Sequence, residues 1–148
     1  MAEEVGADAM EGFPPQALAT CAWAFATAFV AAPTLFGAIA SQALSKMAQF
    51  NPQDLSNLAW AFACVGVDNP LLFHKLARQS IAELDEFSPQ HLSSLAWAFA
   101  TLSAYDVELF HHVSDQVVLK VQYFEPLGLQ NLAWAFASAS ADAPSLFS

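Results

Sequence analysis

A repeat of 37 residues runs through the chain and limits the folds that it can adopt. All four tryptophans recur at this spacing, and twelve of the thirteen phenylalanines follow it in three sets. The tryptophans are Trp23, Trp60, Trp97 and Trp134, and the phenylalanine sets begin at Phe13, Phe25 and Phe36. Chance does not place so many bulky rings on four phases, and a period of about 20–50 residues is typical of solenoids and other repeat arrays.

Each repeat is predicted to hold two helices. The first begins at an N-cap followed by proline, as at Asn51-Pro52, because proline is tolerated at the first helical position. Leu55, Leu58 and Phe62 then follow the i, i+3, i+7 spacing of an apolar helix face. We expect this helix to stop at Gly66 or Ser103, and the second helix to begin at Pro33, Pro70 or Pro144.

These patterns predict an all-α fold. Stacked copies of a helix–turn–helix unit bury the faces that one unit leaves open, so we expect a right-handed α-solenoid of about three and a half units. The predicted organisation is an acidic N-terminal extension over 1–12 and a repeat domain over 13–148, with repeats 13–49, 50–86, 87–123 and an incomplete 124–148.

The charge balance is acidic. Four Lys and Arg face 14 Asp and Glu, giving a net charge of −10, whereas a nucleic-acid arm or a membrane-surface patch needs the opposite sign. The first dozen residues are acid-rich, so we expect no targeting peptide in this chain. The uncharged stretch from Gly12 to Ser45 is split by Pro33 and carries polar residues, so we expect no membrane span.

Residues suited to catalysis or metal binding are few. His74 and His111 share a phase one repeat apart, which places them about 10 Å from each other on stacked helices, too far to share one ion. Cys21 and Cys64 lie in apolar helical sequence, as free thiols often do. Five glycines form no phosphate loop or nucleophile elbow. We therefore expect no enzyme, metal, cofactor or small-molecule substrate.

The tryptophans allow two interpretations. They fill the junctions between repeats, where small residues such as Ala59 and Ala61 let helices approach closely, or they form a ladder on which unpaired bases stack. For the packing interpretation, replacing Trp97 or Phe99 by alanine is expected to cost about 3–5 kcal/mol.

Small polar residues precede the tryptophan in each repeat and vary between repeats. Helical-repeat RNA readers use two or three such side chains per repeat to contact one base. The alternative is that small polar residues only permit a tight helix crossing. The candidate RNA contacts are Thr20, Ser56, Asn57, Ser93, Ser94, Gln130 and Asn131.

Basic residues are absent from the predicted first helices. Lys46, Lys75, Arg78 and Lys120 all fall on second helices. Phosphate contacts from Lys and Arg supply most nonspecific affinity for nucleic acid, so this distribution argues against strong RNA binding by these repeats alone.

The segment 50–63, FNPQDLSNLAWAFA, resembles the repeat core of organellar heptatricopeptide and octotricopeptide repeat proteins. Segments 87–100 and 124–137 are similar, and 13–26 is a weaker copy. The resemblance implies a chloroplast or mitochondrial protein that binds single-stranded organellar RNA and helps to process, stabilise or translate it.

The alternative function is a scaffold that binds protein subunits of a larger organellar assembly. Some related repeat proteins are implied to be architectural subunits, and a short acidic array suits that role. The pair Leu127-Gly128, where other repeats have Gln with Ala, Asp or His, also departs from the repeat pattern.

Overall fold

The computed structural model describes residues 10–143, and over these residues the chain forms helices and no strand. The α-helices are α1 (Pro15–Thr27), α2 (Pro33–Lys46), α3 (Pro52–Cys64), α4 (Pro70–Glu83), α5 (Pro89–Thr101), α6 (Val107–Lys120) and α7 (Pro126–Asp142). Short 3-10 turns follow three of them: η3 (Met47–Gln49), η4 (Leu84–Glu86) and η5 (Val121–Tyr123). The expected all-α repeat fold is confirmed, whereas the helix expected from Pro144 lies outside the described residues.

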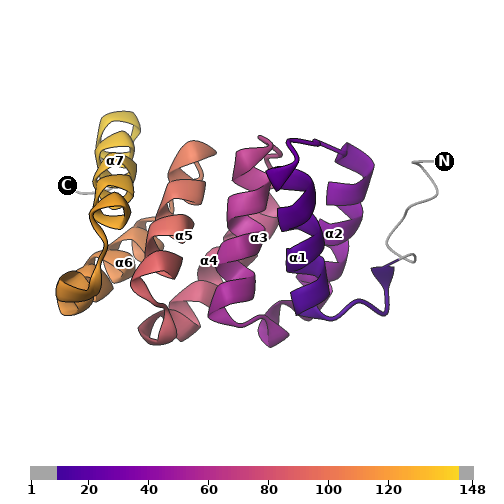
Figure 1. Ribbon diagram of the computed structural model, residues 1–148, viewed down its shortest axis with the longest axis horizontal. Helices are drawn as coiled ribbons and strands as arrows, with labels where there is room; N and C mark the ends of the chain where they lie inside the picture. The colour runs from indigo at the N-terminus through magenta and orange to yellow at the C-terminus, as the bar shows by residue number, and fades with distance from the viewer. Residues whose placement is uncertain (1–9, 144–148) are drawn as a thin grey trace.

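The helices form two layers of a solenoid. The first helices of the repeats, α1, α3, α5 and α7, stand side by side in the front layer of Figure 1, and α2, α4 and α6 lie behind them. Consecutive first helices make the most extensive contacts in the molecule. Each element therefore touches its own repeat and the neighbouring ones, as expected for a stacked array.

Caps define where the first helices begin. The side chain of Asn51 accepts a hydrogen bond from the backbone N–H of Asp54 at 2.8 Å, and Asp54 accepts one from the N–H of Asn51 at 3.4 Å. Ser88 and His91 form the same reciprocal pair in the next repeat. The cap predicted at Asn51 is thus present, with an equivalent at Ser88, and each satisfies N–H groups that the first helical turn leaves unpaired.

Burial in this cap lowers the pKa of His91. Its Nδ1 lies 3.3 Å from the N–H of Ser88, an arrangement that only the neutral ring accepts. Because the folded pKa lies below the ordinary value of 6.5, the stabilising contribution is complete above that pH and is lost as the pH falls. We expect the midpoint temperature of thermal unfolding to be lower at about pH 5.5 than at about pH 7.5. The decrease should be smaller in His91→Gln, because glutamine keeps an acceptor but does not titrate. An equal decrease in the wild type and the variant would contradict the role given to the neutral His91 ring.

A residue with positive φ follows the end of α1, α3 and α5, the first helices of the first three repeats. Gly66 and Ser103, the predicted stops, have φ of 71° and 54°, and Phe29 occupies the equivalent place with φ of 57°. The next amide closes the turn, as the N–H of Val67 does on the carbonyl oxygen of Phe62 at 2.9 Å. The fourth repeat differs, because α7 continues past the equivalent position to Asp142.

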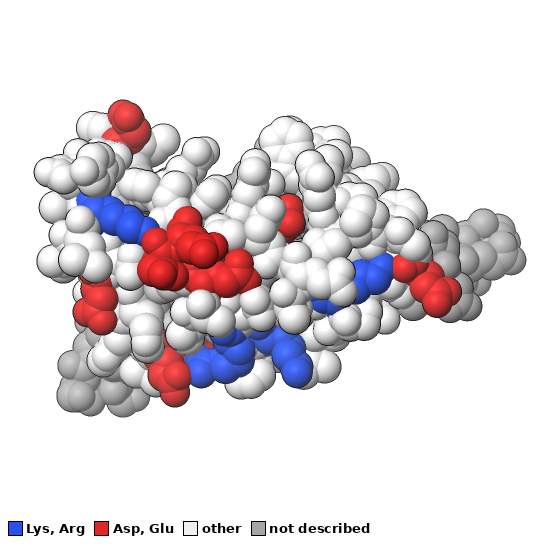
Figure 2. Space-filling view, turned by 90° about the horizontal axis from the view of Figure 1, so that it is seen from below, with Lys and Arg blue, Asp and Glu red and all other residues white. Residues whose placement is uncertain are grey.

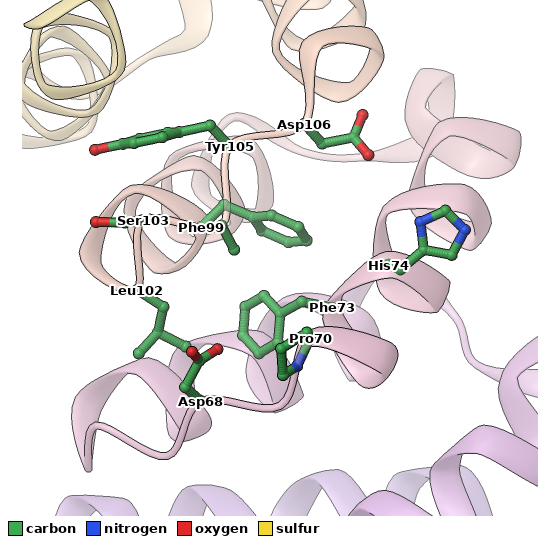
Figure 3. Close-up of a pocket in the computed structure, with 10 residues that line it drawn as sticks. Asp68, Pro70, Phe73, His74, Phe99, Leu102, Ser103, Tyr105 and Asp106 are labelled. Atoms are coloured by element: carbon green, nitrogen blue, oxygen red, sulfur yellow. The ribbon is translucent and has the colours of Figure 1, made fainter. Parts of the chain in front are cut away.

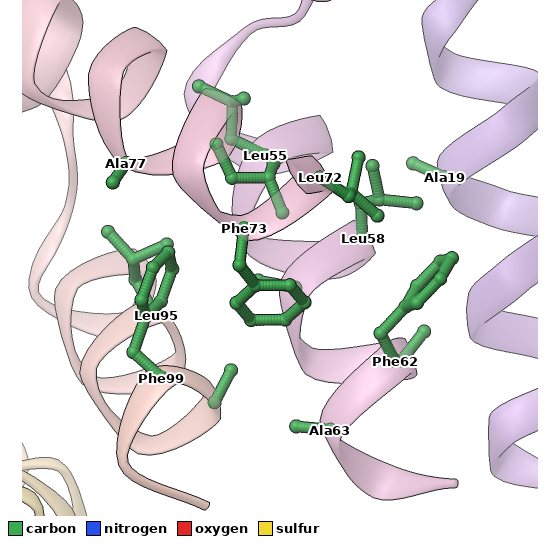
Figure 4. Close-up of a cluster of buried hydrophobic side chains, with 14 of the residues drawn as sticks. Ala19, Leu55, Leu58, Phe62, Ala63, Leu72, Phe73, Ala77, Leu95 and Phe99 are labelled. Carbon is green, nitrogen blue, oxygen red and sulfur yellow. The ribbon is translucent and has the colours of Figure 1, made fainter. Parts of the chain in front are cut away.

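Pairs of phenylalanines join one repeat to the next (Figure 4). The ring of Phe73 in α4 lies 4.8 Å from that of Phe99 in α5, measured between centroids. The equivalent distances are 4.9 Å for Phe36 and Phe62 and 5.2 Å for Phe110 and Phe136. The phenylalanine of each second helix thus packs on that of the following first helix, so phenylalanines, rather than the tryptophans, form the centre of each junction.

Alanines let the first helices approach closely. Ala61, Ala98 and Ala135 are fully buried on the side of α3, α5 and α7 that meets the preceding repeat. A larger side chain at these positions has no space without moving a helix, because protein interiors are close-packed. The front layer is therefore held by small residues, and the region between the layers by phenylalanine and leucine.

Candidate functional site

The first helices leave one stripe of side chains open, which we call the open row. Its members in α3 follow the i, i+4, i+7, i+11 spacing of one helix face, and the other first helices repeat the pattern. The open row consists of Gln16, Thr20, Trp23 and Thr27; Gln53, Asn57, Trp60 and Cys64; Gln90, Ser94, Trp97 and Thr101; and Leu127, Asn131, Trp134 and Ser138. All sixteen are exposed or half-buried, and none is charged.

The tryptophans lie at the edge of the junctions and not at their centre. Trp60 and Trp97 are half-buried and pack against the core, and the outer pair, Trp23 and Trp134, remain 45% and 46% exposed. A neighbouring repeat on each side thus covers Trp60 and Trp97 more than a single neighbouring repeat covers Trp23 and Trp134. The rings of Trp60 and Trp97 therefore pack against the core and remain partly exposed, and the ladder for unpaired bases stays a prediction.

The predicted polar pairs divide between two environments. Ser56 and Ser93 are buried between first helices; the hydroxyl of Ser56 donates to the carbonyl oxygen of Gln53, and that of Ser93 lies 3.1 Å from the carbonyl oxygen of Gly128. These two serines have no surface to offer RNA, and we withdraw them as candidate contacts. Adjacent helical residues point about 100° apart, which is why Ser56 and Ser93 are buried while their neighbours Asn57 and Ser94 stay accessible.

The other predicted contacts are accessible. Thr20 is exposed, and Asn57, Ser94 and Asn131 are half-buried members of the open row, beside the tryptophans. Gln130 is exposed because it has the phase of Ser56 and Ser93 but no repeat covers it among the described residues. The glutamines at 16, 53 and 90 were missed by the sequence analysis, although their 37-residue spacing marks them.

A groove of about 550 Å³ opens in the front layer between α5 and α7. Gln90, Ser94, Leu127 and Asn131 of the open row line it, together with Tyr123. Gly128 explains the local geometry, because a Cβ there would lie 2.9 Å from the Oγ of Ser93. Asp54 and His91 occupy the position of Gly128 in the preceding repeats and cap their helices. In the fourth repeat Gly128 provides no cap and instead allows α7 to lie close to α5.

The molecule binds most of its basic side chains internally. The ammonium group of Lys46 donates to the carbonyl oxygens of Glu11 and Phe13 at 2.6 and 2.7 Å, and Lys120 does the same to Asp85 and Phe87 at 2.9 and 2.6 Å. Both lysines thus fasten the start of their own repeat. These ties occupy the positive charges and hold them away from the open row.

Arg78 of α4 is held by carboxylates of the next repeat. Its guanidinium donates to Asp106 at 2.8 Å and to Glu108 at 2.7 Å. Figure 2 shows this lower side of the molecule, where acidic side chains gather and basic ones are scattered among them. Of the four basic residues, only Lys75 makes no hydrogen bond or ion pair with another described residue. The surface thus offers no basic track for a phosphate backbone.

A second hollow, of about 320 Å³, lies where α4 and α5 meet the start of α6 (Figure 3). Two of its polar groups have structural roles: Asp106 caps α6 and binds Arg78, and the hydroxyl of Tyr105 donates to Asp142 at 2.7 Å. Burial and this hydrogen bond raise the pKa of Tyr105. The arrangement contains no nucleophile paired with a base.

Residues 10–143 contain no cluster of three or more histidine, cysteine or acidic side chains that could hold a metal ion. His74 and His111 are both exposed. None of the helices in this range is long and apolar enough to cross a membrane.

Comparison with known proteins finds one family. The model of the RNA-editing substrate-binding complex 6 protein matches residues 4–143, which is nearly the whole chain. No curated protein matches the chain. The match includes all the helices described above, and the chain therefore belongs to the RNA-editing substrate-binding complex 6 protein family.

Proposed function

We propose that the chain is a non-catalytic subunit of an RNA-editing substrate-binding complex and acts there mainly as a scaffold that binds other protein subunits. The assignment to this complex rests on membership of the RNA-editing substrate-binding complex 6 protein family. One observation favours protein partners over RNA. Lys46, Lys120 and Arg78 are bound by carbonyl oxygens and carboxylates of the chain itself, so their positive charges are not free to bind phosphates. The open row, with four tryptophans and no charge, is the surface that we assign to the partner.

The chemistry of the open row suits a protein interface. Tryptophan supplies a large apolar area with one polar group, and it is enriched among the residues that dominate protein–protein affinity. Amide and hydroxyl side chains around it supply hydrogen bonds at the rim. An RNA ligand would bring phosphates toward a chain with a net charge of −10, without Lys or Arg on the row to neutralise them.

RNA contact by the open row is the second candidate function. One indole and one amide or hydroxyl recur in each repeat, which would suit stacking of single-stranded bases and contact with their edges. This finer proposal links the chain to the heptatricopeptide and octotricopeptide type of repeat. An organellar location stays a prediction, and nothing in the description of the family supports the chloroplast over the mitochondrion. The division into an extension over 1–12 and a repeat domain over 13–148 is likewise proposed.

RNA binding by the purified chain decides between the two functions. We expect no retention of single-stranded RNA even at about 25 mM salt, because charge neutralisation is missing. Saturable binding that weakens with salt and with Asn57→Ala or Asn131→Ala would instead favour the RNA candidate. Ser56→Ala is the matched control, since that hydroxyl is buried and its loss does not change the open row.

The scaffold proposal is tested in the assembled complex. A tagged chain should co-purify with the other subunits after RNase treatment, and the double variant Asn57→Arg, Asn131→Arg should lose them while remaining folded. Ala82→Arg, on an exposed part of α4, adds the same charge elsewhere and should keep them. Loss of the complex on RNase treatment alone would show that RNA, and not a protein contact, holds the chain.

A further inference from the structure

The end of the array formed by α6 and α7 exposes a face that other repeats bury. Leu129 is 36% exposed, whereas its equivalents Leu55 and Leu92 are 0% exposed. Ala133 is exposed, although the same phase is fully buried in the first three repeats. This phase therefore faces the following repeat. Together with Val118 and Phe136, these residues line an apolar hollow of about 240 Å³, and we call this surface the trailing face.

The opposite end exposes the complementary surface, on α1. Phe25 is 37% exposed, whereas Phe62 and Phe99 at the same phase are buried against the phenylalanine of the preceding second helix. Ala24 is exposed, and its equivalents in α3, α5 and α7 are fully buried. This phase therefore faces the preceding repeat. We call this surface, which also includes Phe13, the leading face.

The two faces are the halves of a junction that the chain already makes three times, between α1 and α3, α3 and α5, and α5 and α7. We propose that the trailing face of one copy binds the leading face of a second copy, so that the solenoid continues head to tail from chain to chain. The partner chosen is a second copy because its leading face carries the residue types that cover the trailing side of each inner repeat. This proposal does not rest on the proposed function.

The proposed contact has a definite symmetry. Each copy contributes different residues, so the interface is heterologous, and an unblocked copy always keeps one face free for another. Both faces are apolar at the named positions, so their burial favours association. Assembly should therefore grow with concentration beyond two copies and should not stop at a closed dimer.

Light scattering during gel filtration tests the proposal on the whole chain. The mass of the wild-type protein should rise above 15.9 kDa as its concentration increases from about 1 to about 100 micromolar. Ala133→Arg blocks the trailing face and Ala24→Arg the leading face, and each variant alone should remain monomeric. Mixed together, they should form a one-to-one dimer of twice the single-chain mass, because each retains the face that the other needs.

Ala82→Arg is the matched control, since Ala82 is exposed on α4 away from both ends; it should assemble like the wild type. Circular dichroism checks that every variant is folded. A wild-type protein that stays monomeric up to about 100 micromolar overturns the proposal. Assembly that survives both single variants, or a mixture that yields no dimer, also overturns it.

Discussion

Replacing Phe99 by alanine is expected to lower the free energy of unfolding by about 3–5 kcal/mol. The ring is buried and lies 4.8 Å from that of Phe73, so its removal leaves a cavity at the junction of the second and third repeats. The same ring contributes to the wall of the hollow beside α6. Because repeats are stabilised by their neighbours, the loss should also weaken the coupling across this junction. Chemical denaturation followed by circular dichroism measures both effects, as a lower midpoint and a broader transition.

Phe25 provides the matched control for this substitution. It occupies the same phase in the first repeat, but it is 37% exposed, and no aromatic ring within residues 10–143 pairs with it as Phe73 does with Phe99. Phe25→Ala should therefore cost clearly less than Phe99→Ala. Trp97→Ala should also cost less, because that ring is only half-buried, although the sequence alone predicts the same loss for both. Equal losses for Phe25 and Phe99 would show that the junction pair is not the source of stability.

Enlarging Ala98 to leucine is expected to destabilise the protein by about 1–3 kcal/mol. Ala98 is fully buried where α5 meets α3, and the two helices approach closely because the residue is small. Leucine is a good helix former and is more apolar, so neither helix propensity nor hydrophobicity accounts for a loss. The cost comes from helices that must separate to admit three more carbon atoms.

The same change at Ala24 isolates the packing effect. Ala24 has the phase of Ala98 but is exposed on α1, so Ala24→Leu should leave the thermal midpoint nearly unchanged. Both proteins are compared in thermal melts at low concentration, where association between copies is weakest. A midpoint for Ala98→Leu within a degree or two of the wild type would contradict the close packing of the front layer.

Much of the architecture follows from the sequence because the repeat supplies the same signals several times. The spacing of Trp60 and Phe62 from their copies gives the period, Asn51-Pro52 gives a helix start, and Gly66 gives a helix end. These are local preferences that agree with one another in each unit. Phe29 was harder to predict, because a bulky residue rarely adopts a positive φ and only the neighbouring repeats reveal its role.

The surface was less predictable because it depends on how the helices cross. Ser56 and Asn57 are adjacent and similar in character, yet one is sealed between helices and the other is partly open. A helical wheel gives angles around one helix, but the position of the neighbouring helix decides which angles are covered. The hydrogen bonds of Lys46 and Lys120 could not be predicted either, because they join residues more than thirty positions apart and depend on how the helices pack.

The phenylalanine pairs link each repeat only to the repeats on either side of it. A small change of angle at one such link leaves the others intact, but the changes add along the array. Small rotations at several junctions between repeats therefore displace the two ends of the solenoid more than a rotation at any single junction does. Such elasticity would allow one chain to fit binding partners of different curvature without unfolding a helix.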